Sequence, residues 1–140
     1  MLIMDTDHFS EPLRVSPLGL QLSRRLAVSP LDVAVSVITL EEQARGWLTR
    51  IKQSQSDQEM IRCYYRFQQL VTVAANWTLL EWNTEAQTAF GSLRTRHPRT
   101  GTMDLRIASI VIARNGTLLS RNLKIFNGLT ASMSRTGWNK

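Results

Sequence analysis

The sequence is poor in the residues that many small functional sites require. It contains one cysteine, Cys63, and two histidines among 140 residues. A single cysteine cannot form an internal disulfide, and no Cys/His cluster has the spacing of a zinc site. These absences exclude a disulfide-stapled secreted domain and a structural zinc module, and they favour a reducing cytoplasm.

Long apolar runs and nucleotide-binding loops are also missing. No stretch approaches the ~18 apolar residues that a membrane-spanning helix needs, and the apolar N-terminus meets Asp5 without the basic start of a signal peptide. A Gly-rich phosphate loop and a Gly-x-Ser-x-Gly elbow are absent as well. We therefore expect a cytoplasmic protein without membrane contact.

Acidic residues are nearly absent from the second part of the chain. Residues 1–85 carry eight Lys/Arg against ten Asp/Glu, whereas residues 86–140 carry nine Lys/Arg against Asp104 alone. A basic region favours a polyanionic partner such as a nucleic acid, although charge bias alone is equally compatible with a solvated basic surface. The isolated carboxylate of Asp104 in this basic context indicates a specific role.

The apolar pattern alternates between two periodicities, those of strands and of helices. Strands are expected at residues 2–4, 33–38, 77–82 and 117–120, with an edge strand in the last segment before Trp138; helices are expected at 16–28, 39–54, 61–73, 84–96 and 102–115, with a helical turn at 122–126. The order predicts an α/β fold with a mostly parallel sheet covered by helices on both faces. We found no repeat or linker, so residues 1–140 are expected to form one domain.

Helix-end signals accompany three of these helices. Thr39 with Glu42 and Thr84 with Gln87 match the capping-box spacing, in which a carboxylate or amide returns to the first amide of the helix. Gly116 suits the stop of the helix that contains Asp104.

Three acids fall where the carboxyl ends of parallel strands should meet. Asp5 follows the first strand, Glu42 lies in the expected first helical turn after the second, and Asp104 opens a helix before the fourth. Gathered carboxylates repel one another unless they share protons or bind a cation. A ligand set that contains only oxygen atoms favours Mg²⁺ or Mn²⁺. The chemistry that best fits these three acids is therefore metal-assisted phosphodiester hydrolysis.

Each acid also has a purely structural explanation. Glu42 could serve only the capping box with Thr39, and without further context this is the favoured reading. Asp104 could simply complement the helix dipole, and the segment from Asp5 to Asp7 could be an ordinary helix-entry turn.

The remaining polar and aromatic candidates are weaker. His8 and His97 are interpreted as structural or surface residues. The four tryptophans are spaced as core or interface residues more than as a base-stacking platform. Four arginines flank the loop that carries Asp104 and are candidate contacts to an RNA backbone: Arg94, Arg96, Arg99 and Arg106.

Four short motifs, in order along the chain, resemble those of the VapC-type PIN-domain toxins of bacterial toxin–antitoxin pairs. Residues 4–8 (Met-Asp-Thr-Asp-His) are similar to the opening Leu-Asp-Thr-Asn, and residues 36–42 to Ser-x-Ile-Thr-x-x-Glu, which places the family acid at Glu42 and leaves Glu41 outside the motif. Residues 101–108 resemble Gly-x-x-Asp-x-x-Ile-Ala, and residues 118–126 the Leu-Thr-x-Asn-x-x-Asp/Glu-Phe ending. Each motif is weak alone, but together they span nearly the whole chain.

The resemblance implies a PIN-like three-layer α/β/α sandwich and a Mg²⁺- or Mn²⁺-dependent endoribonuclease. It further implies an RNA substrate, a small antitoxin that blocks the site, and a homodimer. Asp5, Glu42 and Asp104 would be the catalytic and metal-binding carboxylates. Supporting positions would be Thr6, Asp7, Ser120 and Asn122.

Two positions depart from the family pattern. Ile125 stands where a fourth acid is usual, and Asn83 stands where many members carry an aspartate after the third strand. Loss of the fourth acid would weaken a second metal position, and Asp7 could compensate by restoring a negative charge. Ile125 therefore leaves a rival reading open: a degenerate PIN domain that binds RNA or a partner protein without cleavage. A housekeeping PIN nuclease without an antitoxin is a further alternative.

Overall fold

Five parallel strands form one sheet in the computed structural model of the chain, which describes residues 2–4, 33–119 and 134–135. The strand order is β3-β2-β1-β4-β5, so β1 and β4 are neighbours in the sheet although they are not consecutive in the chain. The strands are β1 (Leu2–Met4), β2 (Val33–Ser36), β3 (Thr78–Leu80), β4 (Thr117–Leu119) and β5 (Ser134–Arg135). The sequence prediction of a parallel sheet is confirmed, and the strands at 33–38 and 77–82 are shorter than expected.

The central strand aligns the carboxyl ends of its two neighbours. Met4, the last residue of β1, is paired with Val35 of β2 on one side and with Leu119 of β4 on the other. β2 continues the alignment to β3, where Ser36 is paired with Leu80. Chain segments that leave these strands therefore do so along one edge of the sheet.

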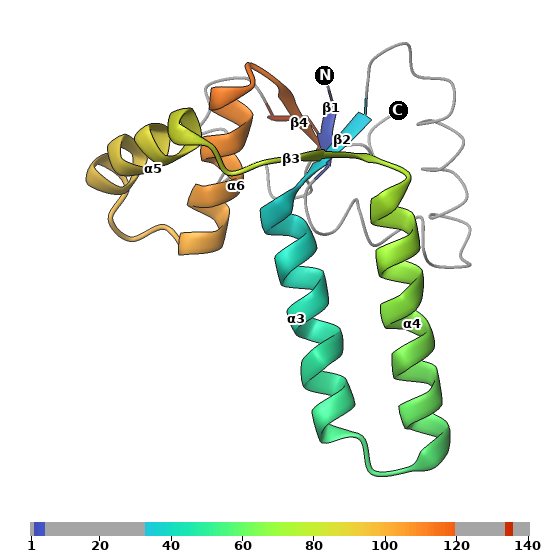
Figure 1. Cartoon of the computed structure of the whole chain (residues 1–140). Coiled ribbons are helices and arrows are strands. Elements are labelled where there is room, and N and C mark those ends of the chain that lie inside the picture. Colours follow the sequence, from blue (N-terminus) through green and yellow to red (C-terminus); the bar gives the residue numbers. More distant parts are fainter. Residues whose placement is uncertain (1, 5–32, 120–133, 136–140) are drawn as a thin grey trace.

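Helices cover both faces of the sheet (Figure 1), and they are α3 (Val37–Gln53), α4 (Asp57–Ala75), α5 (Thr84–Arg96) and α6 (Thr102–Ala113). Ile3 of β1 belongs to a large buried cluster with residues of α5 and α6, including Leu93, Leu105 and Ile110. Neighbouring residues of the same strand, such as Met4, belong to a smaller cluster built with α3 and α4. Because successive strand residues face opposite sides, these clusters establish the expected three-layer α/β/α arrangement.

The start of α3 corrects the expected helix boundary. The helix begins at Val37, and its N-cap is Ser36, whose Oγ accepts a hydrogen bond from the Thr39 amide at 3.1 Å. The Ser36 hydroxyl also donates to Thr39 Oγ1 at 3.3 Å, and both residues are fully buried. Thr39 is therefore the third residue of the helix, and the predicted capping box of Thr39 with Glu42 is wrong. The buried serine ends the strand two residues early because its hydroxyl satisfies a helix amide.

The predicted bounds of α5 are confirmed, but its predicted cap is wrong. Asn83, not Thr84, is the N-cap, and its side-chain oxygen accepts from the Ala86 amide at 2.9 Å. The Gln87 side chain accepts instead from the indole Nε1 of Trp82 at 2.9 Å. Sequence spacing alone could not separate two adjacent residues that both cap helices well.

The end of α6 corrects the expected role of Gly116. Asn115 takes the left-handed conformation, with a φ of 49°, and its amide donates to the Ile112 carbonyl at 3.1 Å. The Gly116 amide donates to the Val111 carbonyl at 3.0 Å. This pair of bonds is the Schellman arrangement, with asparagine in the position that glycine more often fills. It turns the chain directly into β4.

Several expectations concern segments that the structure does not describe. The helix at 16–28 and the turn at 122–126 lie outside the described residues. Within the described segments, no helix is both long and apolar enough to span a membrane.

Candidate active site at the carboxyl edge of the sheet

Glu42 lies in the second turn of α3, one turn beyond the buried start of that helix. Ser36 and Thr39 fix the first turn, and Ile38 anchors it in the larger core cluster. The motif residues that precede Glu42 thus set the direction in which the helix leaves β2. Glu42 is half-buried and is not at a capping position, so the structural explanation based on Thr39 no longer applies.

Asp104 lies in the first turn of α6, as the sequence predicted. The second turn of the helix is anchored by two fully buried residues on one face, Leu105 and Ala108. Asp104 itself is half-buried, and its Oδ2 lies 3.6 Å from the position that a Cβ would take on Gly101. The carboxylate is therefore folded back toward the start of its own helix, where the helix dipole favours a negative charge.

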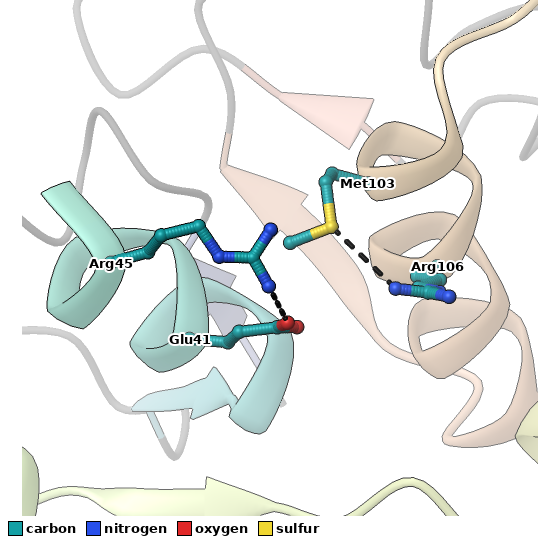
Figure 2. A network of polar contacts seen from close by, with 4 residues as sticks. All are labelled: Glu41, Arg45, Met103 and Arg106. Atoms are coloured by element: carbon teal, nitrogen blue, oxygen red, sulfur yellow. Dashed lines mark hydrogen bonds and ion pairs between the residues drawn. The ribbon is translucent and has the colours of Figure 1, made fainter. Parts of the chain in front are cut away.

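The core brings the starts of α3 and α6 together. Val37 and Ile38 of α3 and Met103 and Leu105 of α6 belong to the same cluster. Figure 2 shows Arg45 of α3 extending toward Met103 of α6. Glu42 and Asp104, separated by more than sixty residues in sequence, consequently lie on neighbouring helix starts at the carboxyl side of the sheet.

The other predicted site residues cannot be placed. Asp5, the third proposed acid, and the predicted supporting residues Thr6, Asp7, Ser120 and Asn122 lie outside the described residues, as does Ile125. Within the described segments, no group of three or more His, Cys, Asp and Glu side chains gathers as a metal site would. Of the three proposed ligands, Glu42 and Asp104 lie among the described residues, and the metal-binding role of all three acids stays a prediction.

The departure at Asn83 has a structural explanation. Its side chain caps α5, a role that asparagine and aspartate fill about equally well. The Asn83 side chain is thus bound to the first turn of α5 and is not required to be charged.

The four predicted RNA-contacting arginines have different environments. Arg94 donates to the Thr100 carbonyl at 2.9 Å and to Thr102 Oγ1 at 2.8 Å. Arg106 lies with its Cζ 5.9 Å from the centre of the Phe90 ring, and its Nη1 is 3.8 Å from the Met103 sulfur. Arg96 and Arg99 are exposed. These positions do not test the predicted contacts to RNA. They show that Arg94 donates hydrogen bonds to acceptors within its own chain.

Sequence reasoning missed one basic residue beside the site. Arg45 of α3 pairs with Glu41, four residues earlier (Figure 2), and its side chain is 69% exposed. The i, i+4 spacing of opposite charges was a readable signal for this pair. Its position opposite α6 was not readable, because that depends on how two distant helices pack.

The fold was compared with known proteins. Solved structures that match over nearly the full chain include FitAcB from Neisseria gonorrhoeae, with 20% identity, a TM-score of 0.75, and 100% of both chains covered. VapBC-1 from nontypeable Haemophilus influenzae has 20% identity and a TM-score of 0.74, covering 99% of this chain and 100% of the other.

VapBC2 from Rickettsia felis, bound to a DNA fragment from its promoter, has 22% identity and a TM-score of 0.70. The match covers 99% of this chain and 100% of the other. No family model and no curated protein sequence matches this chain. At these identities the likeness concerns the fold, and the chain has the PIN-like three-layer fold of these toxin–antitoxin structures.

Proposed function

We propose that this protein is the toxin of a type II toxin–antitoxin pair and acts as a metal-dependent endoribonuclease. One observation carries the proposal: α3 and α6 begin side by side on a shared core cluster, each with a half-buried acid near its start. The central strand β1, which Asp5 follows in the sequence, ends in register with the strand that leads into α3. The fold shared with toxin–antitoxin structures supports the same reading.

The donor chemistry fits a divalent metal ion. Glu42 and Asp104 offer carboxylate oxygens from two firmly anchored helices, which suits Mg²⁺ or Mn²⁺ better than zinc. Together with Asp5 they would be the residues that hold the ion. When bound, it would supply an activated water and offset the charge that develops on the phosphate.

Basic residues of the second half of the chain would hold the RNA backbone. Arg106 lies two residues beyond Asp104, with its guanidinium held over Phe90 and near the Met103 sulfur. Neither contact uses a strong acceptor, so its N–H groups can bind phosphate oxygens. Arg96 and Arg99 are exposed near the same loop and would add non-specific affinity.

A small antitoxin and a second copy of the chain are the proposed partners. The related structures are toxin–antitoxin complexes, some of them with DNA. In this chain, α4 exposes Ile61, Tyr64, Tyr65 and Val71, and such a stripe of apolar and aromatic side chains is typical of surfaces that a partner covers. We also propose a cytoplasmic location, which suits the free thiol of the buried Cys63.

Asp104→Asn tests the proposed chemistry. The substitution keeps the size of the side chain and removes the charge that would hold the metal. Cleavage of total bacterial RNA with added Mn²⁺ should fall by orders of magnitude. RNA affinity, measured by filter binding, should hold steady or rise because repulsion of phosphate is relieved.

The same assay distinguishes an enzyme from a degenerate binding domain, the alternative suggested by Ile125 in place of a fourth acid. Wild-type protein freed of antitoxin should cut, and Arg96→Ala should bind RNA more weakly with a shallower salt dependence while still cutting bound RNA. If the wild type binds RNA but cuts no more than Asp104→Asn, the nuclease proposal is refuted and the binding function takes its place.

A further inference from the structure

The helix that carries Asp104 begins without the device that starts the other described helices. The N-caps of α3, α4 and α5 are Ser36, Ser56 and Asn83, and in each case the side chain accepts a hydrogen bond from a backbone amide of the first turn. The N-cap of α6 is Gly101, which has no side chain to do this. The first turn of α6, which presents Asp104, therefore lacks the side-chain cap that the other three helices have.

Arg94 supplies a restraint from outside the helix. From the last turn of α5, its guanidinium donates to the Thr100 carbonyl at 2.9 Å and to Thr102 Oγ1 at 2.8 Å, with a longer contact to the Pro98 carbonyl at 3.5 Å. The loop before α6 and the first residue of α6 are thus tied to one side chain. The Arg94 Cζ also lies over the Phe90 ring, 5.6 Å from its centre, which adds a cation–π contact to the hydrogen bonds.

We propose that Arg94 is a positioning residue: it fixes the loop at 97–101 and the first turn of α6 so that Asp104 is held in place for metal binding. This inference rests on the proposed function. It assigns Arg94 a role different from that of Arg96, Arg99 and Arg106, because both of its terminal nitrogens already donate to acceptors within the chain.

The chemistry of the side chain explains why arginine suits this place. A guanidinium is a planar fork whose donors reach separate acceptors at once, whereas the single ammonium of lysine acts as a point charge. Here the acceptors are a carbonyl in the loop and a hydroxyl on the helix, two residues apart. Losing the fork should loosen the link between them even if the positive charge is kept.

The experiment compares four variants: Arg94→Ala, Arg94→Lys, Thr102→Ala and, as the matched control, Arg96→Ala from the same helix end. Mn²⁺ affinity is measured by calorimetry, and amide hydrogen exchange reports the order of residues 97–105. Arg94→Ala should weaken Mn²⁺ binding roughly tenfold, the lower end of the range for residues that orient metal ligands. Arg94→Lys should recover only part of the loss.

Thr102→Ala keeps every charge and removes one acceptor, so it remains informative if Arg94→Ala does not fold. It should weaken Mn²⁺ binding about threefold, and its effect should not add to that of Arg94→Ala because both report the same bond. In both variants the exchange of the loop amides should speed up, and the salt dependence of RNA binding should match that of the wild type.

Two results would overturn the inference while the proposed function stands. In the first, the wild type binds Mn²⁺ and cuts RNA, but Arg94→Ala or Thr102→Ala has the same Mn²⁺ affinity as the control Arg96→Ala. The second is a shallower salt dependence for Arg94→Ala with unchanged Mn²⁺ affinity, which would make Arg94 an RNA contact. A wild type that neither binds Mn²⁺ nor cuts RNA would refute the proposed function itself, and the positioning role with it.

Discussion

The two faces of the sheet are covered in different ways. On one face, α5 and α6 pack closely, and residues from Leu105 to Val111 in α6 are buried almost without interruption. On the other, α3 and α4 touch the sheet at one end and project away from it as a long hairpin (Figure 1). Beyond Trp47, which packs on the smaller cluster, Leu48 is already 54% exposed.

This difference separates the part of the molecule that carries the proposed site from the part that exposes apolar side chains. Asp104 sits on the helix with the most continuous burial, so small shifts there would disturb a densely packed core. The outer part of the hairpin carries exposed apolar residues such as Ile61, which is 69% exposed, and contributes little to that core. The chain thus joins a densely packed support for the proposed chemistry to an extended hairpin, the surface proposed for partners.

The largest effect on stability is expected from a matched pair of leucine truncations. Leu105→Ala empties a fully buried position beside Asp104 and should lower the free energy of unfolding by about 2–5 kcal/mol. Leu48→Ala, on the exposed part of the hairpin, should change it by less than about 0.5 kcal/mol. Urea denaturation followed by circular dichroism measures both. Similar losses in the two variants would contradict the division between the faces.

A smaller effect is expected at the cap of α5. Asn83→Ala should cost about 1 kcal/mol in urea denaturation, because the Ala86 amide loses its partner. Asn83→Asp should retain the cap and raise the free energy of unfolding by about 0.3 kcal/mol through the helix dipole. Mn²⁺ affinity should be unchanged in both variants. A marked gain in affinity for Asn83→Asp would instead place this residue in the metal site.

The smallest effect is expected from the exposed ion pair on α3. Glu41→Gln removes the partner of Arg45 and should cost no more than about 0.5 kcal/mol, with the difference shrinking in high salt. Mn²⁺ affinity should match the wild type, in contrast to Glu42→Gln. Calorimetric titration of the two variants side by side checks which of the adjacent acids binds metal. A loss for Glu41→Gln with wild-type affinity for Glu42→Gln would show that the motif alignment is wrong by one residue.

The sequence by itself determined the order of the elements in the described segments and the approximate positions of two acids. Alternating periodicity predicted α5 to the residue and placed Asp104 in a first helical turn, because both signals are local. Local signals failed where two nearby residues could fill the same structural role. Ser36 rather than Thr39 caps α3, Asn83 rather than Thr84 caps α5, and Asn115 rather than Gly116 takes the left-handed turn.

Only the tertiary structure decided what those local choices mean for the site. Because buried Ser36 is the N-cap, α3 starts at Val37 and not at the predicted Thr39. Glu42 therefore does not belong to a capping box. In sequence, Arg94 looks like the other three arginines near Asp104. The packing of α5 against α6 brings it within hydrogen-bond distance of the turn that carries Asp104. The sequence does not show where an arginine side chain points. Its hydrogen-bond partners lie beside it only after the helices have packed, so spacing along the chain could not identify them.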